Sequence, residues 1–139
     1  MIQRKQTLWL LLAAIAAFLT LKFPAYTGNI MSKENIKEFK EINAQYNLLL
    51  LLITNTVAVI SIVTIFLYSN RNKQLIFSSI NLLLALLTCY LYYWQSQKFL
   101  DGAYSITVVL ILSVPIFIVM AIIGIIRDKK LIKSLDRLR

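Results

Sequence analysis

The side chains that could carry chemistry in the middle of the long apolar stretches of this sequence are uncharged. They recur at spacings close to a helical repeat, with Thr54, Asn55 and Ser61 in one stretch and Ser78, Asn81 and Thr88 in the next. Amides and hydroxyls at membrane depth either hydrogen-bond between helices or line a polar pathway for a small substrate. We expect helix packing to be their main role, because no Asp, Glu, Lys or Arg lies between Thr54 and Phe66 or between Ser78 and Thr88.

Residues suited to catalysis or cofactor binding are scarce. The sequence has no histidine and one cysteine, Cys89, which excludes the usual zinc sites, haem held by histidine, and dithiol exchange. The acidic residues lie outside the apolar stretches, away from any paired nucleophile and base. We therefore expect a non-enzymatic protein with no catalytic, cofactor-binding or metal residues, and Cys89 as a small buried apolar residue.

The elements that must position these side chains are membrane-spanning helices. Of the 139 residues, 59% are hydrophobic and 15% are charged, against about 45–50% and 25% in soluble domains. A helix of about 20 residues crosses a hydrocarbon core about 30 Å thick. Apolar stretches at 7–23, 46–69, 75–94 and 105–126 predict an all-α, single-domain membrane protein, with four transmembrane helices in an antiparallel bundle and a tail at 127–139.

Small and weakly polar residues mark the helix faces that pack together in lipid. The third stretch has such a stripe at Ser78, Asn81, Ala85, Thr88, Tyr92 and Gln95. The others offer Ala13, Ala17 and Thr20, then Asn47, Thr54, Ala58 and Ser61 with Asn55 beside them, and finally Ser113, Phe117, Ala121 and Gly124. Pro115 predicts a kink in the fourth helix, where Ser113 is close enough to satisfy a freed carbonyl.

The basic residues predict the orientation, because cytoplasmic connections of membrane proteins are enriched in Lys and Arg. One side collects Arg4, Lys5, Arg71, Lys73, Arg127, Lys129, Lys130, Lys133, Arg137 and Arg139. The other side collects Lys22, Lys33, Lys37, Lys40 and Lys98, together with four acidic residues of the connections. Both termini are therefore expected in the cytoplasm.

Two segments outside the spans have helical patterns. Ile36, Phe39, Ile42 and Tyr46 predict a short outer-loop helix that Ser32 caps. The tail, with Arg127, Lys129, Lys130, Lys133, Arg137 and Arg139, predicts a basic amphipathic helix. It suits anionic lipid headgroups or a cytoplasmic protein partner. Since the charges flank membrane spans, the net charge of +9 favours anionic lipids over nucleic acid as a partner.

The two ends of the sequence resemble a known family. The start, Met1 to Thr7, and the end, Ile126 to Arg139, are similar to those of domain of unknown function 4293, a family of small four-span bacterial inner-membrane proteins. Lys5 stands where the family usually has an apolar residue. The resemblance implies four spans, a bacterial inner membrane and cytoplasmic termini, but no activity. It draws attention to Gln3, Arg4 and Gln6, and suggests that the termini meet each other, as Arg4 with Asp136, or share a partner.

Three functions are compatible with these features. The first is a non-enzymatic accessory subunit of a larger membrane protein complex of translocon, secretion or respiratory type, in contact with other integral membrane proteins. The second is a small oligomeric transporter or channel with a pathway past Thr54, Asn55, Asn81 and Thr88. The third is a lipid-binding protein that acts through its basic tail.

Overall fold

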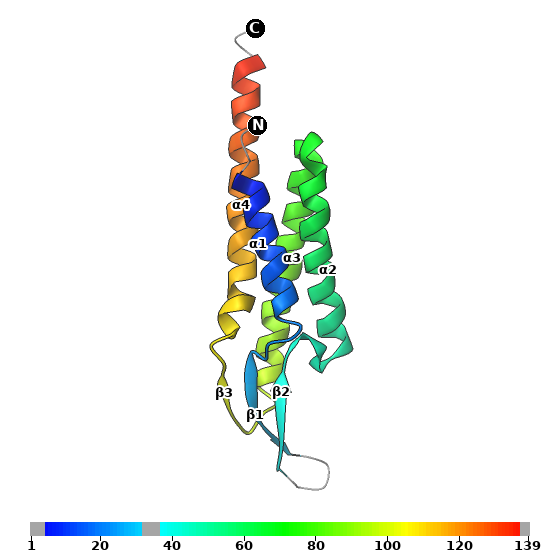
Figure 1. Cartoon of the computed structure of the whole chain (residues 1–139), viewed down its shortest axis with the longest axis vertical. Helices are drawn as coiled ribbons and strands as arrows, with labels where there is room; N and C mark the ends of the chain where they lie inside the picture. The colour runs from blue at the N-terminus through cyan, green and yellow to red at the C-terminus, as the bar shows by residue number, and fades with distance from the viewer. Residues whose placement is uncertain (1–4, 32–36, 137–139) are drawn as a thin grey trace.

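The computed structural model describes residues 5–31 and 37–136. The order of elements is α1 (Lys5–Leu19), β1 (Tyr26–Met31), β2 (Lys37–Ile42), α2 (Leu48–Phe66), α3 (Arg71–Ser96), β3 (Asp101–Tyr104) and α4 (Val108–Asp136). Short 3-10 turns at Ala44–Tyr46 and Leu67–Ser69 flank α2. Figure 1 shows an elongated molecule with the strands at one end, here called the sheet end. The start of α1 and the end of α4 lie toward the opposite end, here called the terminal end.

The prediction of a mostly helical chain with several segments that could cross a membrane is confirmed. Within the described residues, three stretches are long and apolar enough: Leu48–Ser69, Arg71–Ser96 and Val108–Leu131. The first helix is shorter than the predicted span at 7–23. It has 15 residues and ends at Leu19, so its length is about 22 Å. The chain then turns before Pro24, whose fixed φ and missing N–H do not suit a continuing helix.

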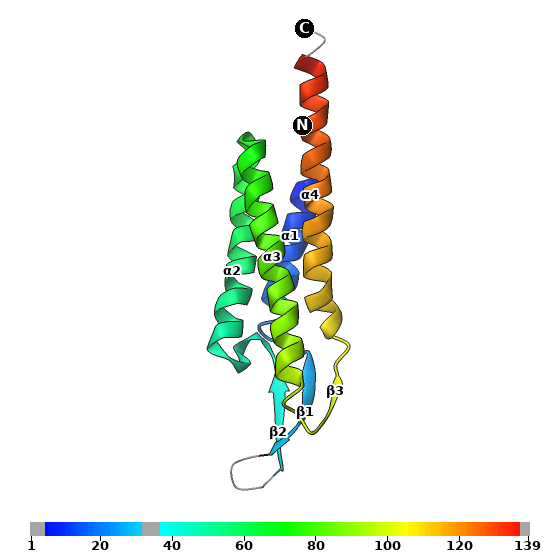
Figure 2. The same ribbon diagram turned by 180° about the vertical axis from the view of Figure 1, so that it is seen from behind.

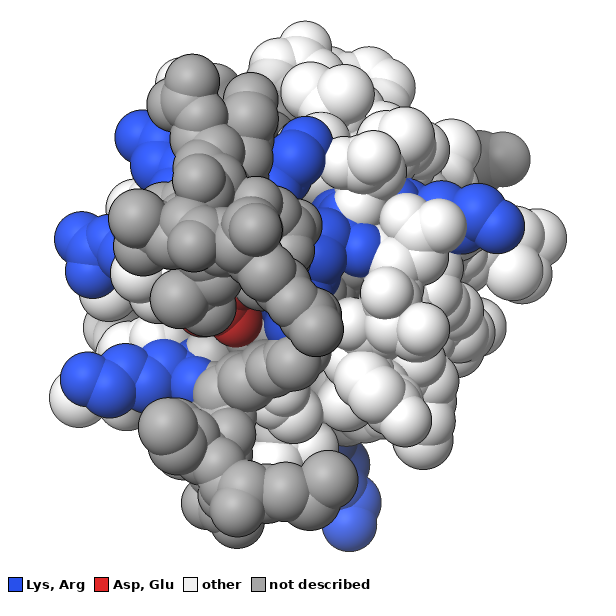
Figure 3. Space-filling view, turned by 90° about the horizontal axis from the view of Figure 1, so that it is seen from above, with Lys and Arg blue, Asp and Glu red and all other residues white. Residues whose placement is uncertain are grey.

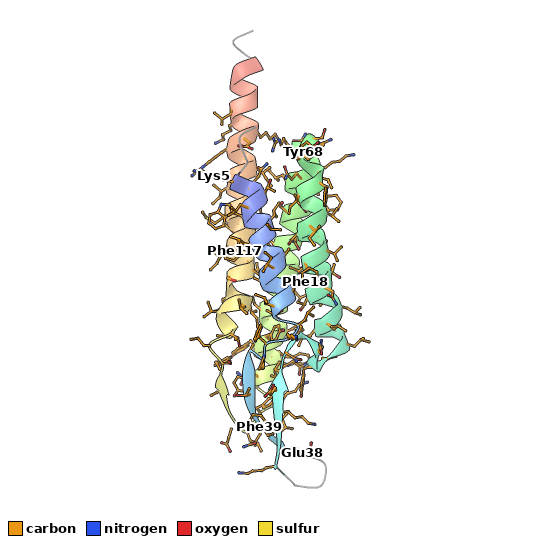
Figure 4. All side chains as sticks on the ribbon, viewed as in Figure 1. Lys5, Phe18, Glu38, Phe39, Tyr68 and Phe117 are labelled. Atoms are coloured by element: carbon orange, nitrogen blue, oxygen red, sulfur yellow. The ribbon has the colours of Figure 1, made fainter. Side chains whose placement is uncertain are left out.

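The helices pack side by side through small residues. Helices α1 and α3 each contact both α2 and α4. Figures 1 and 2 show this arrangement from opposite sides. The centre is formed by Ala13, Ala17, Val57, Ala58, Ala85, Val114 and Ile118, all almost fully buried. The outward faces carry large exposed apolar side chains, such as Leu52, Leu83 and Phe18, and Phe18 is labelled on α1 in Figure 4. A water-soluble monomer rarely exposes apolar surface that is this continuous.

The buried face of α4 differs from the predicted stripe. Of Ser113, Phe117, Ala121 and Gly124, only Ala121 is buried, while the other three are half-buried. The buried positions are instead Ile111, Val114, Ile118, Ala121 and Ile125. Because α1 and α3 present mainly small and polar residues to the core, α4 supplies the large side chains that fill the space between them. A search for small residues alone therefore places this face about one residue away from its true position.

The predicted outer-loop helix is wrong, and so is the expectation of an all-α chain. Residues 37–42 form strand β2, and the sheet has the order β2-β1-β3 with antiparallel pairing throughout. Ser32 and Ile36 lie outside the described residues. Gly28 pairs with Gly102. The two strands are so close there that a Cβ at Gly28 would lie 2.4 Å from the Asp101 carbonyl oxygen and 2.7 Å from the Gly102 Cα. The sheet thus depends on two facing glycines that allow β1 and β3 to approach closely.

The C-terminal segment is helical as predicted, but it is not a separate helix. It continues α4 without a break to Asp136, so residues 127–136 extend along the axis of α4 (Figure 1). A helix lying flat on a membrane surface would need a change of direction after Ile126. Arg137 and Arg139 lie outside the described residues.

Candidate functional site

The first candidate site is a polar cluster inside the terminal half of the molecule. It consists of buried side chains from three helices: Gln6 of α1, Ser61 and Thr64 of α2, and Gln74, Ser78 and Asn81 of α3. The Asn81 Nδ2 donates a hydrogen bond to Ser61 Oγ at 2.8 Å, and Ser61 Oγ donates to the Val57 carbonyl at 2.8 Å. Asn81 and Ser61 therefore join α3 to α2 at a point with no solvent exposure.

A hydrogen-bonded chain crosses the terminal end of this cluster. Arg71 Nη1 lies 3.4 Å from Asp128 Oδ2 of α4 and 3.5 Å from Gln74 Oε1. Gln74 Nε2 donates to the Thr64 carbonyl at 3.3 Å. These contacts link α4, α3 and α2 in one series. Sequence reasoning missed the ion pair because Arg71 and Asp128 lie far apart in the chain. It missed Gln74 because this residue lies just before the predicted span at 75–94, although its polar type, four residues before Ser78, was a usable signal.

Several polar atoms of the cluster have no hydrogen-bond partner among the residues that the structure describes. They are the Gln6 Nε2 and Oε1, the Ser78 Oγ and the Asn81 Oδ1. Gln6 is 1% exposed and faces Gly124, where a Cβ would lie 3.1 Å from the Gln6 Cβ. An unpaired buried polar group costs about 1–3 kcal/mol, so these atoms are suited to a polar guest such as water. Of the N-terminal motif, Gln6 belongs to this core, whereas Gln3 and Arg4 lie outside the described residues.

A second polar site, a small cavity lined by three threonines, lies nearer the sheet end. Thr20, Thr54 and Thr88 line a cavity of about 10 Å³, which is close to the minimum volume for one water molecule. Thr20 and Thr88 donate to the carbonyls of Ala17 and Leu84, while the Thr54 Oγ1 is buried with no hydrogen-bond partner in the described part of the chain. Asn55 is only half-buried, so it does not join Thr54 in this cavity.

An apolar layer separates the threonine cavity from the polar cluster. On α3, Ala85 lies between Asn81 and Thr88, and Val57 and Ala58 of α2 lie between Thr54 and Ser61. These side chains pack with Ile118 in the buried centre. Of the predicted pathway, Thr54 and Thr88 therefore line the cavity and Asn81 belongs to the polar cluster, with apolar side chains between them. Asn55 lies at neither place.

A larger pocket lies between the end of α3 and the start of α4. Its volume is about 440 Å³, and it is lined by Tyr26, Tyr92, Tyr93 and Tyr104 with Ala25, Cys89, Val108, Ile111 and Leu112. We call it the tyrosine pocket. Its inner wall is buried, at 4% exposure for Ile111, whereas Tyr93 and Leu112 are more than half exposed. The tyrosine pocket therefore opens sideways, onto the outer faces of two helices that could cross a membrane.

Cys89 has a role that its type did not predict. Pro115 lacks the N–H that would pair with the Ile111 carbonyl in a regular helix. The Cys89 Sγ lies 3.7 Å from that carbonyl oxygen and is placed to donate to it. Ser113, the expected donor, bonds to the Leu110 carbonyl instead. Cys89 is half-buried, so this contact holds α3 to α4 on the inner wall of the tyrosine pocket.

Basic side chains surround the terminal end. Lys5, Arg127, Lys129 and Lys130 are exposed, and Figure 3 shows basic surface spread over this end with little acidic surface among the coloured residues. Lys133 lies in the described helix. In the part of the chain that the structure describes, no three His, Cys, Asp or Glu side chains gather as a metal site requires.

Three long apolar helices, a core of small and uncharged polar side chains and a basic terminal end define a small helical protein that could span a membrane. The chain belongs to the family described as domain of unknown function 4293, whose model matches residues 2–138. The resemblance at the two ends of the sequence is thus confirmed over nearly the whole chain. No curated protein and no solved structure matches it.

Proposed function

We propose that this protein is a non-enzymatic accessory subunit of a larger membrane protein complex in the bacterial inner membrane. In this proposal all four helices cross the membrane as an antiparallel bundle. The short α1 is completed by the turn that follows it, with local thinning of the bilayer. The basic terminal end faces the cytoplasm, as the distribution of Lys and Arg favours.

The observation that carries the proposal is the extension of α4 beyond the other helices. Arg71, the first residue of α3, pairs with Asp128, so the segment from Lys129 to Asp136 rises about 12 Å past the start of α3. Lys129, Lys130 and Leu131 are exposed on this extension, with Leu131 at 63%. A basic helix with an exposed leucine, held away from the surrounding helices, suits docking to a cytoplasmic surface of a protein partner.

The geometry gives less support to the alternatives. The apolar layer at Ala85 and Ile118 interrupts the pathway expected for a transporter. A lipid-binding tail would lie along the headgroups, whereas α4 continues straight into the extension.

The test is purification of the full chain from its own membrane in mild detergent, followed by mass spectrometry. We expect a partner in fixed stoichiometry. The double variant Lys129→Glu, Lys130→Glu should release that partner, and the matched variant Lys37→Glu, Lys40→Glu at the sheet end should retain it. Recovery of the protein alone, or only as a homo-oligomer, would contradict the proposal. Equal retention by both double variants would contradict the role of the extension.

A further inference from the structure

We propose that the tyrosine pocket binds one acyl chain of a bilayer phospholipid, from the leaflet nearer the sheet end. The lining of the pocket is chemically suited to such a chain. Among the described residues no charged side chain lines it, and those present are aromatic or aliphatic except for Cys89. Cys89 lies beside the Ile111 carbonyl, and the hydroxyl of Tyr104 lies 3.1 Å from Ser96 Oγ. The Cys89 thiol and the Tyr104 hydroxyl are thus engaged, whereas the Tyr92 hydroxyl is buried without a hydrogen-bond partner among the described residues. The lining is otherwise mostly carbon, which favours a mainly apolar ligand.

The size of the pocket also fits one acyl chain. A volume of about 440 Å³ falls within the range of about 300–1,000 Å³ that is usual for sites of small organic ligands. The pocket is therefore large enough for one flexible chain and too small for a helix of a partner protein, whose diameter with side chains is about 10–12 Å.

The pocket opens onto the apolar outer surface of the helices. Its mouth, at Tyr93 and Leu112, is continuous with exposed apolar side chains of α3 and α4, such as Tyr90 and Val109. When these helices lie in a membrane, the mouth faces lipid, and phospholipid is the apolar molecule present there at high concentration. An acyl chain that enters from the side exchanges contacts with neighbouring lipid for contacts with apolar side chains. It also gains the close packing of a preformed pocket.

The sheet end is suited to the headgroup of the same lipid. Tyr26 packs edge-on against Tyr104 with ring centroids 4.9 Å apart, and tyrosine rings favour the depth of the membrane interface. In the turn after α3, the Lys98 amine lies 4.7 Å from the centre of the Trp94 ring. That amine is at the end of the molecule where the phosphate of a lipid with its chain in the pocket would lie.

Pro115 lies just beyond the α4 wall of the pocket. The α4 wall is the segment just before this proline, including Ile111 and Leu112. Cys89 replaces the missing helical donor from the α3 side, which keeps the two helices joined at the inner wall while the mouth stays open.

The test uses the full chain in nanodiscs of phosphatidylethanolamine and phosphatidylglycerol, with a trace of phosphatidylethanolamine that carries a photoreactive diazirine in one acyl chain. After illumination, mass spectrometry of peptides should place adducts on the pocket residues, including Tyr92, and on outward lipid-facing residues. In the variant Leu112→Trp, which fills the mouth, we expect the adducts at Tyr92 to be lost. The matched variant Leu87→Trp, at an exposed position of α3 that is on a different face from Cys89 and Tyr93, should keep them.

A second arm fills the pocket after the protein has folded. The chain has one cysteine, so benzyl maleimide in detergent labels Cys89 alone. Labelled protein, reconstituted as before, should lose the adducts at Tyr92, whereas Cys89→Ser treated with the same reagent should keep them. If Leu112→Trp and the labelled protein both retain the adducts, the lipid is only annular and the proposal is overturned. The same conclusion follows if unmodified protein has no adduct at Tyr92.

Discussion

The Ser61→Ala variant removes the oxygen that accepts the hydrogen bond of the Asn81 amide. Both side chains have 0% exposure, and the Asn81 Oδ1 already lacks a partner. The variant therefore leaves the whole amide unpaired in the core. Because an unsatisfied buried polar group costs about 1–3 kcal/mol, we expect Ser61→Ala to lower the free energy of unfolding by about that amount.

The converse variant, Asn81→Leu, should cost less. It loses one interhelical hydrogen bond, which is worth about 0.6 kcal/mol on average in membrane proteins. It also removes the unpaired oxygen, and Ser61 keeps its bond to the Val57 carbonyl. We expect a net change within about 1 kcal/mol. In the Asn81→Leu background, Ser61→Ala should cost little, because no amide is left to lose its partner.

The assay is reversible unfolding of the full chain in mixed micelles, monitored by tryptophan fluorescence and circular dichroism. Thr56→Ala and Ser79→Ala are the controls. Their hydroxyls also bond to carbonyls of their own helices, but on exposed faces, so each should be close to wild type. If Ser61→Ala costs the same with and without Asn81, the amide does not depend on this bond and the reasoning is refuted.

Three further variants test other contacts. Arg71→Gln should destabilise the protein by about 1–3 kcal/mol because it breaks the pair with Asp128, and the charge swap Arg71→Asp with Asp128→Arg should recover part of the loss in the same unfolding assay. Gly124→Leu should push α1 from α4 at Gln6 and cost about 1–3 kcal/mol; an unchanged unfolding midpoint would argue against close contact there. Gly28→Val should separate β1 from β3, so the amides of Leu100 and Ser105, which bond to Asn29 and Ala25, should exchange hydrogen faster while those of α2 do not.

The helices could be predicted from the sequence because their signals are local. Long apolar stretches placed α2, α3 and α4, and the repeat of small and polar residues on α3 picked out positions such as Asn81 and Gln95, which the structure buries. The ends were less predictable. Asn47 and Asn70 cap α2 and α3 through their side-chain oxygens, so α3 begins at Arg71, four residues before the predicted span.

The sheet and the pocket could not be predicted in this way, since they depend on partners that are distant in the chain. In 37–42 the spacing of Phe39 and Ile42 fits a helix when taken alone, and only the pairing with β1 makes it a strand. The inner wall of the tyrosine pocket depends on Cys89 meeting the carbonyl freed by Pro115, a relation between two helices that no local pattern contains. The facing glycines, Gly28 and Gly102, were the signal that was available.

The pairing of β1 with β3 has a consequence for the order of events during synthesis. β1 leaves the ribosome soon after α1, but its partner β3 lies in the connection between α3 and α4. The pairing of Thr27 with Ala103 therefore cannot form until β3 has been synthesised. Contacts between residues this far apart in a chain form late. Until then β1 has an unpaired edge that other strands can join. A protein whose synthesis or insertion stops before β3 keeps that unpaired edge. The complete three-stranded sheet therefore distinguishes a finished molecule from an incomplete one.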